Sequence, residues 1–374
     1  MKAAEERYDD AVDLLKKLIA TPSFSREEKD TADSIAAFLE KQGVTPQRTG
    51  NNIWALPKYF DAAKPVLLLN SHHDTVKPNP QYTRDPFMPA VENGKLYGLG
   101  ANDAGGPLVA LIAAFLHFYA KPGLPWNIVL AATAEEEISG FNGIEALLKD
   151  AAFRKATAVD EAAPFANWCA IVGEPTLMKL AVAEKGLLVL DAVARGKAGH
   201  AAREEGVNAI YAAMHDIHWF SEYRFPKQSP TLGPVKMSVT VIHTENKAHN
   251  VVPAECRYTV DIRVTDAYTH EEILEIVRRS VKSDLQARSM RMRATGIALD
   301  HPLVKAGLSM GKEYYGSPTC SDKALMPFPA LKCGPGDSAR SHSADEFIYL
   351  RELEEGIAEY VELIGLAFRA GEGS

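Results

Sequence analysis

Short apolar runs that end at ionisable residues constrain the fold of this chain more than any other feature. Helical patterns separate these runs, and strands that alternate with helices predict an α/β layer with a mixed, largely parallel sheet. Ligands of such sheets bind beyond the carboxyl ends of the strands, so we expect the ionisable residues to gather there. The clearest runs, each with a following ionisable residue, are Val66–Leu69 with His72, Asn127–Thr133 with Glu135, and Cys169–Val172 with Glu174.

The pattern changes after Pro175 and returns to helices and glycine-rich loops beyond about residue 293. Between these points the segments follow the order β-α-β-β-α, which predicts a small two-layer α+β domain with an antiparallel sheet. We therefore expect a catalytic domain of residues 1–178 and 293–374 and an inserted domain of residues 179–292. The inserted strands are expected at Gly186–Ala194, Val235–Ile242 and Cys256–Val264, and the inserted helices at Val207–Phe220 and His270–Ala287.

Further helices are expected in the catalytic domain. Ser25 and Glu28 have the spacing of a capping box, which predicts a second N-terminal helix that ends near Gly43. Gly307–Gly311 matches the pattern of a serine nucleophile elbow, but it follows the start of an ordinary helix, and we set that reading aside. The other predicted helices are Gly105–Tyr119, Gly143–Leu148 and Tyr349–Phe368.

Charge and composition argue against several classes of protein. The 374 residues carry a formal net charge of −8 without a basic stripe, so we expect no nucleic-acid partner. The N-terminal residues lack the apolar core of a secretory signal, and no apolar run approaches ~20 residues, so we expect no membrane span. The four cysteines show no paired spacing, which favours reduced thiols in a cytoplasmic protein, although their even number leaves a disulfide open.

Five segments place acids and imidazoles at the ends of buried strands or among small residues. A charged side chain in such a place is costly unless something compensates it. For carboxylates gathered with neutral histidines, the simplest compensation is a bound divalent cation. The segments are Ser71–Asp74, Ala101–Gly106, Ala134–Glu137, Val172–Thr176 and Ser341–Ser343.

Each of these segments also has a structural explanation when it is taken alone. Asp103 could cap a helix, and Glu135–Glu137 could form an acidic first helical turn. His72 and Asp74 suit a capped loop as well as a metal ligand with the carboxylate that orients it. Glu174 could be a polar strand terminus, and His342 could be a surface histidine. The order of the five segments in one chain favours the metal site.

A longer series of short motifs completes the pattern. They are Ser71–Val76, Asp85–Phe87, Gly94–Gly98 leading to Asp103, Glu136–Glu137, Gly173–Thr176, Lys185–Gly186, Gly196–His200, Asn250–Pro253, Asp261–Arg263, and Gly334–Gly336 leading to His342 and Glu346. With them, nearly the whole chain resembles the zinc-dependent family of acetylornithine deacetylases, succinyl-diaminopimelate desuccinylases, aminoacylases and related carboxypeptidases. The resemblance implies a zinc-peptidase-like catalytic domain and an inserted lid and dimerisation domain.

By this resemblance each chain binds two Zn²⁺ ions, and Co²⁺ or Mn²⁺ could replace them in sites of oxygen and nitrogen ligands. Asp103 would bridge the two ions, and Asp74 would orient His72. The implied ligands are His72, Asp103 and Glu174 for one ion, and Asp103, Glu137 and His342 for the other.

The resemblance also implies catalytic and substrate-binding roles. Glu136 would be the general acid/base, and His200 would stabilise the developing oxyanion. In one arrangement His200 would reach across the dimer interface into the active site of the partner. Asn250 and Arg263 would bind the polar end of the substrate, although Arg263 also fits a salt bridge on a sheet surface. Lys323 could meet an acyl group or an α-carboxylate.

The implied function is removal of the acyl group from an N-acyl-L-amino acid by a cytoplasmic homodimer. The expected substrate is an N-acetyl or N-succinyl derivative of ornithine or citrulline, as in arginine biosynthesis. Two alternatives remain. One is a dipeptidase or carboxypeptidase on the same scaffold, and the other is a binding protein that has lost catalytic activity. Departures from the family pattern point to a divergent substrate subgroup; they are Leu99, Ala104–Gly105, Ser139 and Asn246–Lys247.

Overall fold

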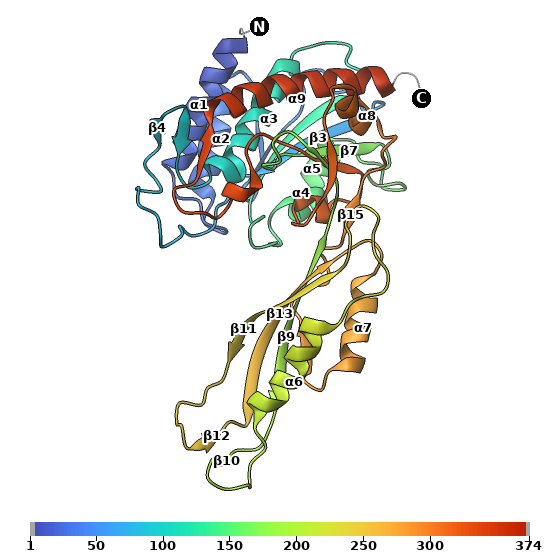
Figure 1. The fold of residues 1–374 in the computed structure, drawn as a ribbon. Coiled ribbons are helices and arrows are strands. Elements are labelled where there is room, and N and C mark those ends of the chain that lie inside the picture. Colours follow the sequence, from blue (N-terminus) through green and yellow to red (C-terminus); the bar gives the residue numbers. More distant parts are fainter. Residues whose placement is uncertain (1–3, 372–374) are drawn as a thin grey trace. The chain divides into compact units, whose positions relative to one another are not determined.

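The computed structural model describes residues 4–371, which form two compact units (Figure 1). The first unit consists of the chain up to Val182, Gly296–Tyr315, and the chain from Ser321 onward. The second unit consists of Ala183–Thr295 and Gly316–Cys320.

A large mixed sheet forms the centre of the first unit, in the order β1-β2-β6-β3-β7-β17-β8-β15, with β16 beside β8. The central pairs β6–β3, β3–β7 and β7–β17 are parallel, and β2 is antiparallel to β6. The mixed, mainly parallel sheet expected from the sequence is therefore confirmed. The strands are β1 (Gln47–Thr49), β2 (Asn52–Ala55), β3 (Val66–His72), β6 (Asn127–Thr133), β7 (Trp168–Val172), β8 (Leu180–Glu184), β15 (Thr295–Gly296), β16 (Tyr314–Ser317) and β17 (Ala330–Lys332).

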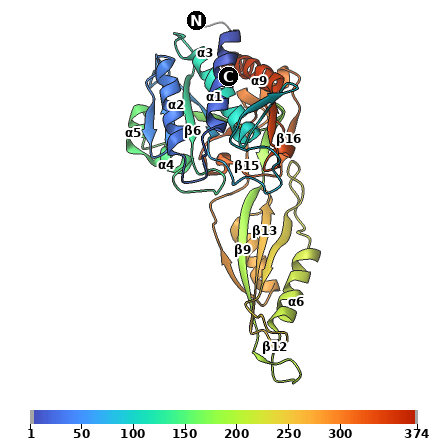
Figure 2. The ribbon, with the colours of Figure 1, turned by 90° about the vertical axis from the view of Figure 1, so that its left-hand side faces the viewer.

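Both faces of this sheet are covered, which explains why β3 and β6 are apolar without alternation. Leu67 and Leu69 enter one core together with α1, α2, α3, α8 and α9. Val66 and Leu68 point the opposite way and enter a second core with α4 and α5. Figure 2 shows α4 and α5 apart from α3 and α9. The helices are α1 (Ala4–Ile19), α2 (Lys29–Lys41), α3 (Gly106–Phe118), α4 (Ile144–Lys149), α5 (Ala151–Ala156), α8 (Pro302–Ser309) and α9 (Leu350–Gly371).

One segment of the described residues, Ala101–Phe118, is long and apolar enough to cross a membrane, but 89% of it is buried inside the protein. It is the core helix α3 with the turn before it, and it packs against α1 and α9. Beside this turn lies a small sheet in the order β18-β5-β4. Its strands are β4 (Ala90–Glu92), β5 (Lys95–Tyr97) and β18 (Phe347–Tyr349).

The second unit has a four-stranded antiparallel sheet in the order β11-β13-β9-β14, with α6 and α7 packed on one face. Burial alternates along β9 and β13, as a sheet with one covered face requires. A small ribbon of β10 and β12 extends from this unit. The elements are β9 (Gly186–Arg195), β10 (Gly199–His200), α6 (Ala209–Glu222), β11 (Lys236–His243), β12 (Val251–Val252), β13 (Glu255–Val264), α7 (His270–Ser280) and β14 (Asp284–Ala287).

Two predictions about helix ends are wrong. The helix expected at His270–Ala287 ends at Ser280, because the buried carboxylate of Asp216 accepts hydrogen bonds from the backbone N–H groups of Lys282 and Ser283 and draws the chain away. Ser25 and Glu28 do not form a capping box at α2. Ser25 instead donates a hydrogen bond to Asp74, over a separation of 49 residues that no local pattern reveals.

Candidate metal centre

The five predicted metal ligands meet at the carboxyl edge of the large sheet. His72 is the last residue of β3, Glu137 follows β6, and Glu174 follows β7. Asp103 lies in a distorted turn, Ala101–Gly105, at the start of α3, and His342 lies in the loop before β18. Parallel strands end at one edge of a sheet, and this brings together residues that are far apart in the sequence.

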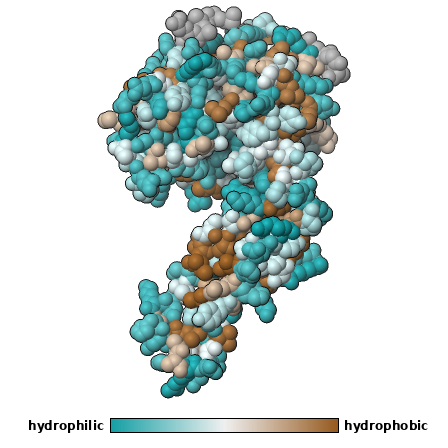
Figure 3. Space-filling model, in the orientation of Figure 1, coloured by the Kyte–Doolittle hydropathy of each residue, from teal (hydrophilic) through white to brown (hydrophobic). Residues whose placement is uncertain are grey.

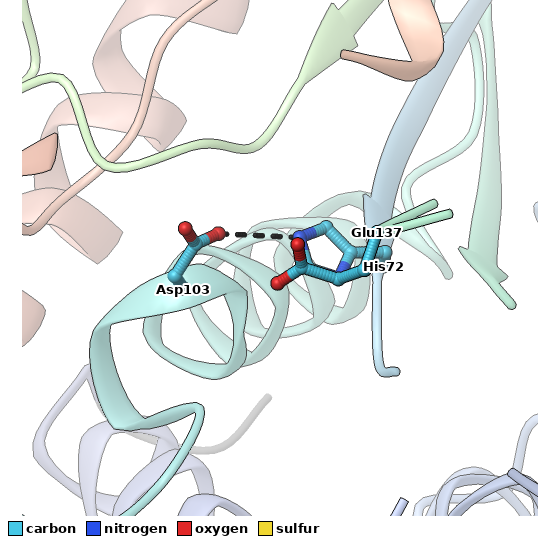
Figure 4. A group of neighbouring side chains, drawn as sticks. All are labelled: His72, Asp103 and Glu137. Carbon is cyan, nitrogen blue, oxygen red and sulfur yellow. Dashed lines mark hydrogen bonds and ion pairs between the residues drawn. The ribbon is translucent and has the colours of Figure 1, made fainter. Parts of the chain in front are cut away.

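The ligand atoms are close enough to share cations. His72 Nε2 lies 3.3 Å from Asp103 Oδ1 and 3.9 Å from Glu174 Oε1. His342 Nε2 lies 3.0 Å from Glu137 Oε2 and 3.7 Å from Asp103 Oδ2. Figure 4 shows His72, Asp103 and Glu137 converging, and their ligand atoms lie within 4.8 Å of one another. The structure thus brings together the five residues to which the resemblance gives metal-binding roles.

Burial and mutual repulsion shift the protonation of this cluster. Burial raises the pKa of Glu136 well above its usual range and that of Glu174 to about 8. Burial also acts to raise the pKa of Asp103, but the hydrogen bond and charge of His72 bring it down to about 2. The hydrogen bond to Glu137 raises the pKa of His342 to about 9. The cluster therefore holds protons at neutral pH that a divalent cation would displace on binding, so this donor set fits such a cation.

Asp74 fixes predicted metal ligands at the ends of two strands, His72 at the end of β3 and Glu137 after β6. Its buried carboxylate accepts hydrogen bonds from the backbone N–H groups of Glu136, at 3.0 Å, and Glu137, at 3.2 Å. Ser25 Oγ donates a third, at 2.7 Å. His72 Nδ1 lies 3.0 Å from the main-chain oxygen of Asp74 and 3.4 Å from its carboxylate. When Nδ1 donates to that oxygen, the lone pair of Nε2 faces Asp103 and is available to a cation.

The three consecutive glutamates take different positions. They lie in a non-helical turn, so the alternative of an acidic first helical turn is wrong; α4 begins only at Ile144. Glu135 turns away with a φ of 56° and accepts hydrogen bonds from the backbone and side chain of Asn142. Glu136 and Glu137 point into the cluster, where Glu136 Oε2 lies 3.9 Å from His72 Nε2. Glu135 therefore shapes the turn that presents the other two.

Several groups near the centre were missed by the sequence reasoning. Asp322 accepts a hydrogen bond from Thr133 Oγ1 at 2.7 Å, and burial raises its pKa to about 6. Lys332 is buried at the end of β17, and its charge partly offsets the effect of burial on Glu174. Glu346 was part of a motif but had no assigned role. The only sequence signal for these residues is polarity beside an apolar run, which is too common to identify a site.

The predicted substrate contacts have other partners in this structure. Lys323 is 1% exposed, and its ammonium lies 3.4 Å and 3.3 Å from the main-chain oxygens of Ala181 and Val182. Arg263, in the second unit, forms a two-pronged ion pair with Asp261 at 2.8 and 3.0 Å. This is the sheet-surface salt bridge that the sequence left open.

His200 and Asn250 lie in the second unit, on or beside the ribbon of β10 and β12. His200 is exposed, and its Nδ1 accepts a hydrogen bond from the backbone of Ala202. Asn250 is also exposed, and its main-chain oxygen accepts a hydrogen bond from Ala201. Their catalytic and binding roles stay predictions.

Known proteins match both the sequence and the fold. A family model described as peptidase family M20/M25/M40 matches residues 68–365. A succinyl-diaminopimelate desuccinylase of Stenotrophomonas maltophilia (strain K279a) is 30% identical over 380 residues, covering 94% of this chain and 98% of that protein. A succinyl-diaminopimelate desuccinylase of Xylella fastidiosa (strain M23) is 30% identical over 274 residues, 68% of each chain.

Solved structures show the same fold. The M20 family metallo-carboxypeptidase Sso-CP2 from Sulfolobus solfataricus has a TM-score of 0.73 and 18% identity, over 96% of this chain and 99% of that one. The YXEP protein of Bacillus subtilis, described as a dinuclear metal-binding peptidase of the M20 family, has a TM-score of 0.69 and 14% identity, over 98% and 99%. Fold, site and matches together define a metal-dependent hydrolase of amide bonds. The chain belongs to peptidase family M20/M25/M40.

Proposed function

We propose that this chain is an N-acyl-L-amino acid amidohydrolase that uses two divalent cations, which we expect to be zinc. The observation that carries the proposal is the convergence of two histidines and four carboxylates at the carboxyl edge of the sheet. Two bound cations would polarise the scissile carbonyl and lower the pKa of the attacking water. The residues that would hold them are His72, Asp103 and Glu174 for one, and Asp103, Glu137 and His342 for the other.

Glu136 is the group best placed to move the proton. It lies in the cluster, and burial raises its pKa well above the usual range. A carboxylate with a raised pKa takes a proton from water and later releases it to the leaving nitrogen. Asp74 supports this role because it fixes the backbone of Glu136.

The proposed class of N-acyl amino acid amidohydrolases includes substrates with different acyl groups and different amino acids. The relatives are named for the desuccinylation of succinyl-diaminopimelate, so they do not support the ornithine or citrulline substrate expected from the sequence. We retain N-acetyl or N-succinyl ornithine or citrulline as one candidate and N-succinyl-diaminopimelate as the other. His200 remains our proposed stabiliser of the developing oxyanion. Asn250, Arg263 and Lys323 remain our proposed substrate contacts; Arg263 would have to leave Asp261 to take up this role.

We also propose a homodimer formed through the second unit. β11 is an edge strand of its sheet, and an unpaired edge can accept a strand from a second copy. Tyr211 and Met214 on α6 are 71% and 56% exposed, and Val241 and Ile242 on β11 are exposed as well. Figure 3 shows apolar residues gathered over the sheet of this unit. Sedimentation of the protein as a monomer at micromolar concentration would overturn this proposal.

The central experiment is a substrate panel on the metal-loaded protein and its Glu136→Gln variant. The panel contains N-acetylornithine, N-succinylcitrulline, N-succinyl-diaminopimelate and simple dipeptides. We expect turnover of an N-acyl amino acid, and a fall in kcat of at least about 100-fold in the variant, because the proton carrier is lost. Metal content should not change.

The matched control is Glu161→Gln, which alters an exposed carboxylate paired with Arg154 in the same unit and should leave kcat unchanged. Turnover of dipeptides alone would favour the peptidase alternative. A Glu136→Gln variant as fast as the parent would show that another group moves the proton.

A further inference from the structure

Glu346 links the segment that carries Asp103 to the segment that carries His342. Its Oε1 accepts hydrogen bonds from the backbone N–H groups of Asn102, at 2.8 Å, and Asp103, at 2.9 Å. Its Oε2 accepts a third from Gly100, at 3.2 Å. The residue is 2% exposed, so these bonds are shielded from water. The hydrogen bonds from these backbone N–H groups offset part of the cost of burying the carboxylate.

The main chain of Glu346 is fixed as well. Its carbonyl oxygen accepts a hydrogen bond from Gly98, at 3.0 Å, and its N–H donates to Tyr82 Oη, at 3.3 Å. Within residues 4–371, the recorded ion pairs give its carboxylate no lysine or arginine partner. The hydrogen bonds that its carboxylate accepts thus come from the turn before α3 and from Gly100 directly before that turn.

Asn102 makes the reciprocal contact. Its side-chain oxygen accepts a hydrogen bond from the backbone N–H of Asp337, and its amide donates to the main-chain oxygen of Asp337, both at 3.0 Å. Asn102 is fully buried. Two polar side chains, one from each segment, therefore clamp the segments together from both sides.

We propose that Glu346 is a positioning residue that holds Asp103 and His342 at the spacing required by the cation they share with Glu137. This inference rests on the function proposed above. His72 ends β3 and Glu174 follows β7, and these two strands pair in the centre of the large sheet. His342 lies outside any strand or helix, and its side chain is 54% exposed. Loss of the clamp should therefore weaken the cation bound by His342 more than the other cation.

The test measures metal affinity in the Glu346→Gln variant. Glutamine has nearly the same size, but its amide nitrogen would face a backbone N–H group instead of accepting from it. We expect the affinity of one binding step to fall at least tenfold and that of the other to change less than threefold. Competition of Zn²⁺ with a chromophoric chelator measures both steps, and the absorption spectrum of the Co²⁺ protein reports the geometry of the ligands.

Three further variants make the test decisive. His342→Ala identifies the binding step that belongs to His342. Glu355→Gln, which alters an exposed pair with Arg351 on α9, is the matched control and should leave both steps unchanged. Asn102→Ala removes the other half of the clamp and should weaken the same step as Glu346→Gln.

The outcomes separate this inference from the proposed function. If Glu346→Gln binds both cations with the affinity of the parent while His342→Ala loses one binding step, the inference about Glu346 is wrong and the proposed function is unaffected. Equal weakening of both steps overturns the inference too. Failure of both Glu346→Gln and Asn102→Ala to fold without metal would show that the clamp serves folding, which also contradicts the positioning role. A parent protein that binds fewer than two cations would overturn the proposed function itself.

Discussion

At the scale of single residues, neighbours in the sequence have unrelated tasks. His72 faces the candidate metal centre, whereas His73 points the other way into a buried network. The Nε2 of His73 lies 3.0 Å from the main-chain oxygen of Asn51, to which it must donate, and its Nδ1 lies 2.9 Å from Thr31 Oγ1. His73 is therefore held in its neutral form, and burial lowers its pKa to about 4.

This burial makes the metal-free protein sensitive to acid. The pKa of His73 is about 4 in the folded state, below the ordinary value of 6.5 expected after unfolding. The stabilisation that comes from neutral His73 is thus complete above pH 6.5 and is lost as the pH falls from 6.5 through 4. The loss in the free energy of unfolding is about 3 kcal/mol at most. Urea unfolding across this range should show a steeper loss for the parent than for His73→Gln.

The same comparison with His243→Gln provides the control, since that side chain is exposed and lies in the second unit. The other titrating groups are common to the parent and the variants, so those that do not interact with His73 cancel in the difference; Asp74 and His72 do interact with it. An equal pH dependence for His73→Gln and the parent would contradict the assignment of His73 as a buried neutral base.

At the scale of elements, the loops after the strands are joined to one another. The loop after β7, which carries Glu174, pairs with the loop after β17. Thr176 donates its backbone N–H to the oxygen of Gly334 at 3.1 Å and accepts the N–H of Gly334 on its hydroxyl, also at 3.1 Å. Leu177 donates to the oxygen of Gly336 at 2.7 Å. The position of Glu174 thus depends on a segment about 160 residues away in the chain.

Gly334 permits this close approach. A Cβ at this position would lie 2.6 Å from the main-chain oxygen of Glu174 and 2.7 Å from the hydroxyl of Tyr360. Gly334→Ala should therefore lower the free energy of unfolding of the metal-free first unit by about 1–3 kcal/mol. It should also weaken the metal-binding step that involves Glu174.

Gly365→Ala is the matched control, because a Cβ at that position in α9 would meet nothing within 4 Å. Alanine suits a helix interior better than glycine by about 1 kcal/mol, so this variant should be slightly more stable than the parent. Chemical denaturation with a chelator present measures both effects. A Gly334→Ala variant as stable as Gly365→Ala would refute the steric argument.

At the scale of the whole molecule, each unit has its own hydrophobic core. The sheet and helices of the first unit enclose two buried clusters, one on each face. The second unit has a separate cluster between its sheet and α6 and α7. All the predicted metal ligands belong to the first unit. Metal binding should therefore stabilise one unit directly.

Calorimetry of the protein with and without Zn²⁺ tests this division. We expect two unfolding transitions, of which only one moves to higher temperature when metal is added, because a ligand stabilises the unit that binds it. Thr269→Ala removes the capping box of α7 and identifies the other transition, which it should lower by the equivalent of about 1 kcal/mol. A single transition that moves as a whole would show that the two units unfold together.

The sequence predicted most of the regular elements, because period and composition are local properties. The strand expected at Asn127–Thr133 has those bounds in the structure, and the long apolar helix begins and ends within one residue of its prediction. Failures occurred where distant groups intervened. Ser25 was assigned to a helix cap but binds Asp74, and residues 284–287 left the helical pattern to form β14.

The sequence alone predicted the mixed, mainly parallel sheet, from apolar runs that end in acids and histidines, and it predicted the candidate ligands through the family that its motifs resemble. The distances between these ligands, the separate positions of Glu135, Glu136 and Glu137, and the bonds of Glu346 were decided only by the tertiary structure. The physical reason is that a hydrogen bond that a buried carboxylate accepts from the backbone of another segment leaves no trace in the periodicity of either segment. It exists only once the sheet has brought their ends together.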